Sequence, residues 1–241
     1  MGLVKMKRDL LTHNIILVLS LVFIILNIGC SGKLKDAAEH YDIAVIHWGQ
    51  GRVDDAIEEY KKAISIYPGF EIAHFNLGYV YYQKGDIGLA IESFKRAIES
   101  KPDLIEAHSM LGVAYEKYNM FNDAMEEYQK ALELNPNIAV SHTNLGNLYF
   151  KMEMHEEAID EHKKAIEIKP DFAEAYNNLG YVYFEQRKYG IAVNEFKKAI
   201  ELKPGYISAH NNLGNTYINV GLREKAKEEY EIVKKLTSKN R

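Results

Sequence analysis

Residues 173–206 read AEAYNNLGYVYFEQRKYGIAVNEFKKAIELKPGY, and this stretch decides the fold because variants of it fill most of the chain. The prolines give its period. The chain has five prolines, and successive ones lie 34 residues apart: Pro68, Pro102, Pro136, Pro170 and Pro204. The copies span residues 37–70, 71–104, 105–138, 139–172, 173–206 and 207–240. The sequence therefore predicts a repeat protein.

Each repeat is predicted to form two helices. With Ala173 as position 1, positions 4, 7, 8 and 11 share one helical face, and positions 20, 24, 27 and 28 share another. Position 8 is Ala44 in the first repeat and glycine in all later ones, and position 20 is always alanine. These small residues allow the two helices to approach closely. Proline at position 32 ends the second helix. The unit is therefore a helical hairpin.

Position 15 lies in the turn between the two helices. It is occupied in four repeats by Gly51, Gly85, Asn119 and Gly221. Glycine and asparagine suit the left-handed conformation that often ends a helix. Glu153 and Arg187 occupy the position in the other two repeats, so we expect looser turns there. Aspartates three residues ahead of a glutamate predict N-terminal capping boxes at Asp36, Asp103 and Asp171.

The pattern resembles the tetratricopeptide repeat family, which has leucine-glycine, tyrosine, alanine, an aromatic residue, alanine and proline at these spacings. In residues 173–206 the matching residues are Leu179, Gly180, Tyr183, Ala192, Phe196, Ala199 and Pro204. The resemblance covers residues 37–240. It implies an all-α fold, a right-handed α-solenoid (superhelix) of six 34-residue helix-turn-helix units. Each unit in such an array buries its apolar face against its neighbours, and we expect a monomeric solenoid.

The resemblance also implies a concave groove lined by positions 2, 5, 6, 9, 12 and 13 of the first helices. On this sequence it predicts a peptide-binding groove of Tyr41, Trp48, Phe75, Asn76, Tyr79, Tyr82, Asn144, Asn147, Asn177, Asn178, Tyr181, Phe184, Asn211, Asn212 and Asn215. The amides offer donors and acceptors that suit the backbone of an extended peptide. Those at position 6 look like the asparagine ladder in the repeat arm of O-GlcNAc transferases, although asparagine there is common in the family whatever the ligand. The lysines of the family's dicarboxylate clamp are missing, so acidic chaperone tails are not expected as ligands.

Residues 1–29 have the parts of a lipoprotein signal peptide. Three basic residues precede an apolar run at residues 15–28, and Gly29 precedes Cys30. A helix of that length reaches about 21 Å, short of the roughly 30 Å hydrocarbon core. The end of the run resembles a bacterial lipobox, although Asn27 replaces the usual leucine. The prediction is cleavage before Cys30, acylation of Cys30, and a short linker over residues 30–36. An uncleaved signal anchor in the inner membrane is the alternative. Ser31, the residue after the predicted acylation site, favours sorting of the lipoprotein to the outer membrane.

Catalytic and cofactor chemistry are not expected. Position 4 carries five histidines, namely His40, His74, His108, His142 and His210. Metal–histidine bonds are about 2.0–2.1 Å long whereas packed helices lie about 8–10 Å apart, so one metal cannot bridge this column. We interpret these histidines, and also His155 and His162, as packing residues between helices. The chain shows neither a phosphate-binding glycine loop nor a nucleophile–base signature. A net charge of −4 argues against nucleic-acid binding.

The prediction is therefore a non-catalytic protein–protein interaction scaffold. It is a membrane-anchored lipoprotein, on the periplasmic or extracytoplasmic face, that binds a peptide segment or partner protein in its groove to assemble an envelope complex. Six repeats behind a lipobox resemble in architecture the pilotin lipoproteins of type IV pilus assembly. The alternatives are a periplasmic chaperone, an adaptor of peptidoglycan enzymes, or a signal-anchored inner-membrane protein.

The outer faces of the terminal repeats are polar. Positions 21 and 28 are apolar in the first five repeats but become Lys227 and Lys234 in the sixth. At position 3, Glu39 replaces the small residue of the later repeats. Polar outer faces are needed at the ends of repeat arrays, so this pattern predicts that the array ends at six repeats.

Overall fold

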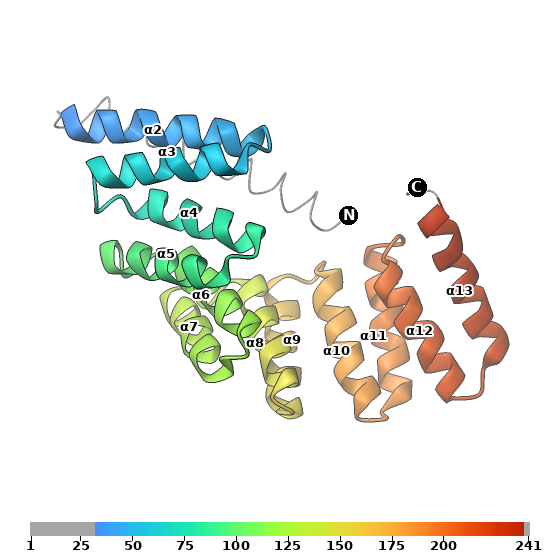
Figure 1. Cartoon of the computed structure of the whole chain (residues 1–241). Coiled ribbons are helices and arrows are strands. Elements are labelled where there is room, and N and C mark those ends of the chain that lie inside the picture. The colour runs from blue at the N-terminus through green and yellow to red at the C-terminus, as the bar shows by residue number, and fades with distance from the viewer. Residues whose placement is uncertain (1–31, 239–241) are drawn as a thin grey trace. The chain divides into compact units, whose positions relative to one another are not determined.

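The computed structural model describes residues 32–238, and every regular element in that range is an α-helix (Figure 1). The hairpins are formed by α2 (Gly32–Gly49) with α3 (Val53–Ile66), α4 (Glu71–Lys84) with α5 (Ile87–Ser100), α6 (Ile105–Lys117) with α7 (Phe121–Leu134), α8 (Ala139–Lys151) with α9 (His155–Ile168), α10 (Ala173–Glu185) with α11 (Tyr189–Leu202), and α12 (Ile207–Asn219) with α13 (Arg223–Ser238). The predictions of an all-α fold and of one hairpin per repeat are confirmed.

The described chain forms two compact units, residues 32–107 and 108–238. The boundary falls within α6. In the first unit, α3 packs on α4, so the first two hairpins stack. In the second unit, α7 packs on α8, α9 on α10, and α11 on α12. The second helix of one hairpin therefore covers the first helix of the next, as expected for repeats that cannot bury their apolar faces alone.

The two helices of a hairpin meet where glycine at position 8 faces an aromatic ring at position 24. A Cβ atom added to Gly78 would lie 2.8 Å from the ring of Phe94, and one added to Gly180 would lie 2.9 Å from that of Phe196. Carbon atoms pack at about 3.5–4.0 Å, so a larger residue at position 8 would push the helices apart. The predicted close approach of the two helices is confirmed. The ring at position 24 packs directly against the glycine at position 8.

A continuous apolar core joins the last three hairpins of the second unit. Ile159 on α9 is buried in one cluster with Leu179 on α10 and Leu213 on α12. Val193 and Ile200 on α11 pack against the same cluster. These residues occupy positions 7, 21 and 28. The helix face predicted to contact the next repeat therefore does form the contact between repeats. Full burial of one such side chain contributes about 1.5–3 kcal/mol.

All six turns within the hairpins contain a residue with positive φ. Gly51, Gly85 and Gly221 have φ values of 76°, 93° and 80°. Asn119, Glu153 and Arg187 have φ values of 58°, 61° and 58°. The prediction that Glu153 and Arg187 loosen their turns is therefore wrong. Packing of the two helices fixes the turn geometry, and the unfavourable residues adopt it.

Two predictions about helix starts are also wrong. The first helix, α2, begins at Gly32, so most of the predicted linker over residues 30–36 is helical and Asp36 lies inside the helix. The N-cap of α10 is Phe172 rather than Asp171, and no side chain caps it. The residue that follows Asp171 is apolar and half-buried, which places the helix start one residue later than a capping box requires.

The predicted signal peptide over residues 1–29 and the predicted acylation site Cys30 lie outside the described residues. Between Gly32 and Ser238, none of the helices combines the length and the apolar character needed to cross a bilayer.

Candidate functional site

Four asparagine side chains in the second unit form a chain of hydrogen bonds across three first helices. Asn212 on α12 donates from Nδ2 to Oδ1 of Asn177 on α10, at 3.0 Å. Asn177 donates in turn to Asn178 at 3.1 Å. Asn178 donates to Oδ1 of Asn147 on α8 at 2.9 Å. We call these four residues the amide chain. All its bonds run in one direction, so Nδ2 of Asn147 is left as a donor and Oδ1 of Asn212 as an acceptor.

The amide chain joins helices that belong to different repeats. Asn178 and Asn212 occupy position 6 of the fifth and sixth repeats, and each reaches back to the preceding first helix. A hydrogen bond within a protein contributes about 0.5–1.5 kcal/mol to stability. The amide chain therefore stabilises the packing of α8, α10 and α12 against one another. Its two open ends are available for a ligand.

A row of aromatic rings lies beside the amide chain. Phe150 on α8 contacts Tyr181 on α10 with ring centroids 5.4 Å apart. Tyr181 stacks on Phe184 at 6.2 Å, and Phe184 contacts Tyr189 at 5.6 Å. Phe150 also contacts the imidazole of His155 at 5.4 Å. We call these five residues the aromatic row. Tyr181 is 39% exposed, so the row offers an aromatic surface to solvent as well as packing the hairpins together.

A pocket of about 270 Å³ opens where the amide chain meets the aromatic row. Its lining residues are Asn147, Phe150, His162, Asn177, Asn178, Tyr181, Val182 and Asn212. All four members of the amide chain take part. None of the lining residues is an aspartate, glutamate, lysine or arginine.

His162 on α9 is the most deeply buried polar group of this pocket. The side chain is fully buried, and neither ring nitrogen has a hydrogen-bond partner within residues 32–238. A Cβ atom on Gly146 would lie 2.8 Å from its Cε1 atom, so the ring lies directly on the backbone of α8. Burial lowers the pKa of His162 to about 4, against a weaker raising effect from Glu161. The imidazole is therefore neutral near pH 7.

The second unit places the predicted amides in different settings. The pocket brings together Asn147, Asn177, Asn178 and Asn212 with Tyr181. Asn177 is only 6% exposed, so its contribution is to hold its neighbours. Phe184 belongs to the aromatic row but not to the pocket lining.

Three predicted groove residues of the second unit lie outside the pocket. Oδ1 of Asn215 accepts a hydrogen bond from the hydroxyl of Tyr230 at 2.7 Å. Asn144 and Asn211 are half-buried and do not line the pocket.

The first unit corrects part of the predicted groove. Tyr41 is 1% exposed, Asn76 4% and Tyr79 5%. The amide of Asn76 donates to the Tyr41 hydroxyl at 2.7 Å, and Tyr79 meets the edge of Trp48 at 6.1 Å. The prediction that Tyr41, Asn76 and Tyr79 line an open groove is therefore wrong, because position in the repeat gives the direction of a side chain but not its depth. The remaining three, Trp48, Phe75 and Tyr82, are half-buried.

The sequence does not distinguish His162 from the other histidines. It predicts a packing residue, and the structure does pack the ring against Gly146, but both ring nitrogens are buried without a hydrogen-bond partner among residues 32–238. The overlooked signal is that position 24 holds phenylalanine or tyrosine in every other repeat: Tyr60, Phe94, Tyr128, Phe196 and Tyr230.

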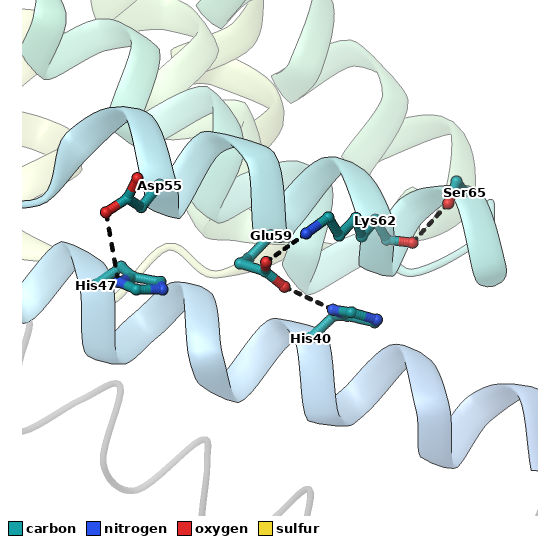
Figure 2. A network of polar contacts seen from close by, with 6 residues as sticks. All are labelled: His40, His47, Asp55, Glu59, Lys62 and Ser65. Carbon is teal, nitrogen blue, oxygen red and sulfur yellow. Dashed lines mark hydrogen bonds and ion pairs between the residues drawn. The ribbon is translucent and has the colours of Figure 1, made fainter.

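The histidines at position 4 are used for structure. In the first hairpin, Nδ1 of His40 on α2 lies 2.5 Å from a carboxylate oxygen of Glu59 on α3 (Figure 2). The ammonium of Lys62 contacts the other oxygen at 2.6 Å. Hydrogen bonds from Lys62 first, and then from His40, lower the pKa of Glu59. Figure 2 also shows His47 facing Asp55 between the same two helices, at 3.9 Å.

The same contact recurs in three further hairpins. His108 pairs with Glu127 at 2.6 Å, His142 with Glu161 at 2.5 Å, and His210 with Glu229 at 2.6 Å. The other ring nitrogens of His142 and His210 lie 2.9 and 3.0 Å from the carbonyl oxygens of Pro136 and Pro204. Each imidazole thus ties the two helices of one hairpin together. In residues 32–238 no group of three or more histidine, cysteine, aspartate or glutamate side chains is arranged to hold a metal ion.

Family models match the sequence over residues 49–240. A model described as "TPR repeat" matches residues 49–85, 78–118, 154–187 and 180–221. Models described as "Tetratricopeptide repeat" match residues 105–138, 127–160 and 207–240. The chain belongs to the tetratricopeptide repeat family. A comparison of the sequence with curated proteins gives no match.

Several solved tetratricopeptide repeat structures are similar to this chain. The crystal structure of MamA is 30% identical with a TM-score of 0.61, over 68% of this chain and 96% of MamA. YrrB, described as "a TPR protein with an unusual peptide-binding site", is 23% identical with a TM-score of 0.57, over 73% of this chain and 91% of YrrB. PilF of Pseudomonas aeruginosa is 16% identical with a TM-score of 0.73, over 86% of this chain and 94% of PilF. At these identities, YrrB and PilF show the fold alone.

Proposed function

We propose that this tetratricopeptide repeat protein is a non-catalytic scaffold that binds an extended peptide segment of a partner protein across α8, α10 and α12. The observation that carries the proposal is the amide chain, whose Asn147 donor and Asn212 acceptor are open beside the pocket. A peptide backbone offers donors and acceptors in alternation, so it complements both ends.

The aromatic row supports the same ligand. Phe150 and Tyr181 line the pocket together with the amides, so one ligand can contact both surfaces. Aromatic side chains supply a large apolar contact area and are enriched at interfaces. A segment with a polar backbone and an apolar side chain uses both surfaces at once. The absence of charged lining residues disfavours an acidic or basic tail as the ligand.

Binding is tested with detergent-solubilised full-length protein and a display library of random 12-residue peptides. We expect the parent protein to enrich a set of peptides. The double variant Asn178→Ala with Asn212→Ala should bind the selected peptides roughly ten- to a hundredfold more weakly, because each lost hydrogen bond contributes about 0.5–1.5 kcal/mol. The matched control is Asn122→Ala with Asn194→Ala, which removes two exposed asparagines on second helices. Circular dichroism checks that helicity is unchanged.

An equal loss of affinity in both double variants would contradict the proposal, because the effect would then not belong to the amide chain. Unchanged affinity in the Asn178 and Asn212 variant would place the peptide on another surface.

We also propose that Cys30 carries a lipid and holds the scaffold at a membrane surface, where it assembles an envelope complex as pilotin lipoproteins do. The support is the basic start, the apolar run at residues 15–28, and Gly29 before the single cysteine. Only six residues separate Cys30 from Ala37, the first residue of the repeats, so the repeats would lie close to that surface.

The anchor is tested by the Cys30→Ser variant in a bacterial host. We expect mass spectrometry of the parent protein to show loss of residues 1–29 and an acyl group on Cys30, whereas the variant keeps its full mass. An intact, unacylated N-terminus in the parent protein would contradict acylation and favour the uncleaved signal anchor.

A further inference from the structure

An exposed apolar patch lies on two turns near the C-terminal end of the second unit. Ile218, Val220 and Leu222, at the turn between α12 and α13, are 49%, 42% and 44% exposed. Ile191, on the first turn of α11, is 44% exposed. One hydrogen bond of 3.4 Å joins the start of α11 to the end of α12, so the two turns are neighbours. We call these four residues the turn patch.

The turn patch departs from the pattern of the repeat. Positions 14 and 16 lie on either side of the residue with positive φ, and they are polar in the first, second and fifth repeats: Gln50, Arg52, Lys84, Asp86, Gln186 and Lys188. The sixth repeat has Val220 and Leu222 there, beside Gly221 with its φ of 80°. The turn conformation itself does not require apolar residues, because polar ones flank the same conformation elsewhere. Contiguous exposed apolar side chains mark sites for partners or membranes.

Four exposed basic side chains belong to the same two turns: Arg187, Lys188, Arg223 and Lys225. None of the four forms an ion pair with a carboxylate within residues 32–238. The ammonium groups of Lys188 and Lys225 each lie 5.8 Å from the ring centroid of a tyrosine on the preceding helix. The described chain therefore leaves these four positive charges without a counter-charge.

The acidic residues near these turns are fewer, and two of them are engaged. Glu185 accepts a hydrogen bond from the hydroxyl of Tyr181. Glu156, from the preceding turn, accepts one from the amide of Gln186 at 3.0 Å. Glu224 is exposed. The turn patch is therefore bordered mainly by positive charge, although the whole chain has a net charge of −4.

We propose that the turn patch binds the surface of a bilayer that contains anionic phospholipid. Aliphatic side chains enter the boundary between headgroups and acyl chains, and the basic side chains around them keep their charges at the level of the headgroups. Basic residues near an anionic membrane strengthen such binding. This proposal rests on the membrane anchor of the proposed function, because a lipid on Cys30 would hold the repeats beside a bilayer and raise the local concentration of lipid.

A folded protein partner fits this surface less well. Stable protein–protein interfaces bury about 800 Å² per partner and are enriched in aromatic side chains. The turn patch offers only four aliphatic side chains, each less than half exposed. Binding to a bilayer scales with the apolar area that enters it and with the attraction between charges, so a small patch with a basic border is sufficient.

The test uses detergent-solubilised full-length protein inserted into vesicles that carry a phospholipid with a photoreactive group near its glycerol. After illumination, mass spectrometry locates lipid adducts on the protein. In vesicles of equal amounts of phosphatidylcholine and phosphatidylglycerol, we expect adducts on residues 185–191 and 218–225. In vesicles of phosphatidylcholine alone, we expect at least about tenfold fewer adducts on these two segments, because the attraction of several basic residues is lost.

The apolar contribution is tested by Val220→Ser with Leu222→Ser. This variant should give about tenfold fewer adducts on the two segments, because two aliphatic side chains no longer enter the bilayer. The matched control is Tyr118→Ser with Met120→Ser, which removes side chains that are 54% and 41% exposed from the same two positions of the third repeat. That control should keep the adducts on both segments. Circular dichroism checks that both variants stay helical.

The basic border is tested by Arg223→Gln with Lys225→Gln. In the vesicles with phosphatidylglycerol, this variant should also give about tenfold fewer adducts on the two segments. The matched control is Lys163→Gln with Lys197→Gln, which removes two exposed lysines within α9 and α11. It changes the net charge equally and should keep the adducts.

The outcomes separate this proposal from the membrane anchor. If the protein floats with the vesicles but forms no adducts on either segment, the lipid site is overturned, the anchor stands, and the turn patch is left for a protein partner. Equal adducts in both kinds of vesicle, or unchanged adducts after the loss of Arg223 and Lys225, also overturn the proposal. If the protein floats with neither kind of vesicle, the proposed anchor fails and this proposal fails with it.

Discussion

At the scale of single residues, one ring at the candidate site departs from the repeat pattern. Position 24 normally fills the space over a glycine with a phenylalanine or tyrosine, and His162 fills the same space with a polar ring. Burial holds this imidazole in its neutral form, and its pKa falls to about 4. Four of the five histidines at position 4 differ, because their imidazoles face carboxylates between the two helices of a hairpin, as His40 does in Figure 2.

The buried state of His162 predicts a pH dependence of stability. Its folded-state pKa is below the unfolded value of 6.5, so between about pH 6.5 and pH 4 the unfolded chain binds a proton that the folded chain does not. Stability from this group is therefore lost as the pH falls through that range. We expect the free energy of unfolding of the parent protein, relative to His162→Phe, to fall by about 2 kcal/mol between pH 7 and pH 5.

Urea unfolding of the two proteins at both pH values measures this difference. Other titrating groups are common to both chains and cancel in the comparison. A difference that is the same at pH 7 and pH 5 would show that the imidazole is accessible to protons in the folded protein.

At the scale of the helices, the 34-residue period was enough to predict each hairpin and the faces that it buries. Glycine at position 8 predicted the close approach of the two helices, and positions 21 and 28 predicted the contact between repeats. The period could not predict how deeply Tyr41 or Asn177 is buried, because depth depends on the neighbouring repeat. It also could not predict that the amides hydrogen-bond to one another, because that requires distances between helices.

The turns show where packing overrides local preference. Glu153 has a φ of 61° between α8 and α9, a conformation that glycine adopts freely and that costs other residues about 1–2 kcal/mol. We expect Glu153→Gly to raise the free energy of unfolding by about 1 kcal/mol, measured by thermal and urea unfolding. Glu153 is exposed, so little packing is lost.

A matched control is Glu92→Gly, which changes an exposed glutamate within α5. Glycine costs about 1 kcal/mol inside a helix, so this variant should be destabilised. Destabilisation of both variants would show that the strain at Glu153 is already relieved by its surroundings.

At the scale of the whole chain, the fold is a series of repeats, and within the second unit the neighbouring faces of the repeats are apolar. Ile159 and Val193, at position 21, pack against the core of the second unit. The equivalent residue on α13 is Lys227, and Lys234 replaces the apolar residue at position 28; both lysines are exposed. We expect Lys227→Ile with Lys234→Ile to make the protein self-associate at micromolar concentration, because the change creates an exposed apolar patch.

Sedimentation velocity measures that association. The control is Lys163→Ile with Lys197→Ile, at exposed positions of α9 and α11. If both double variants associate equally, the association is a non-specific effect of added apolar surface and not a property of the α13 face. A Lys227 and Lys234 variant that sediments like the parent protein would show that this face cannot receive a second repeat stack.

The most direct measurement of peptide binding is photo-crosslinking of a library-selected peptide to the full-length protein. The peptide carries benzoylphenylalanine in place of one of its apolar residues, and the crosslinked protein residues are identified by mass spectrometry. We predict crosslinks on α8, α10 and α12, around the amide chain and the exposed ring of Tyr181. Crosslinks confined to α9, α11 and α13, or to residues 32–107, would contradict the proposed binding surface.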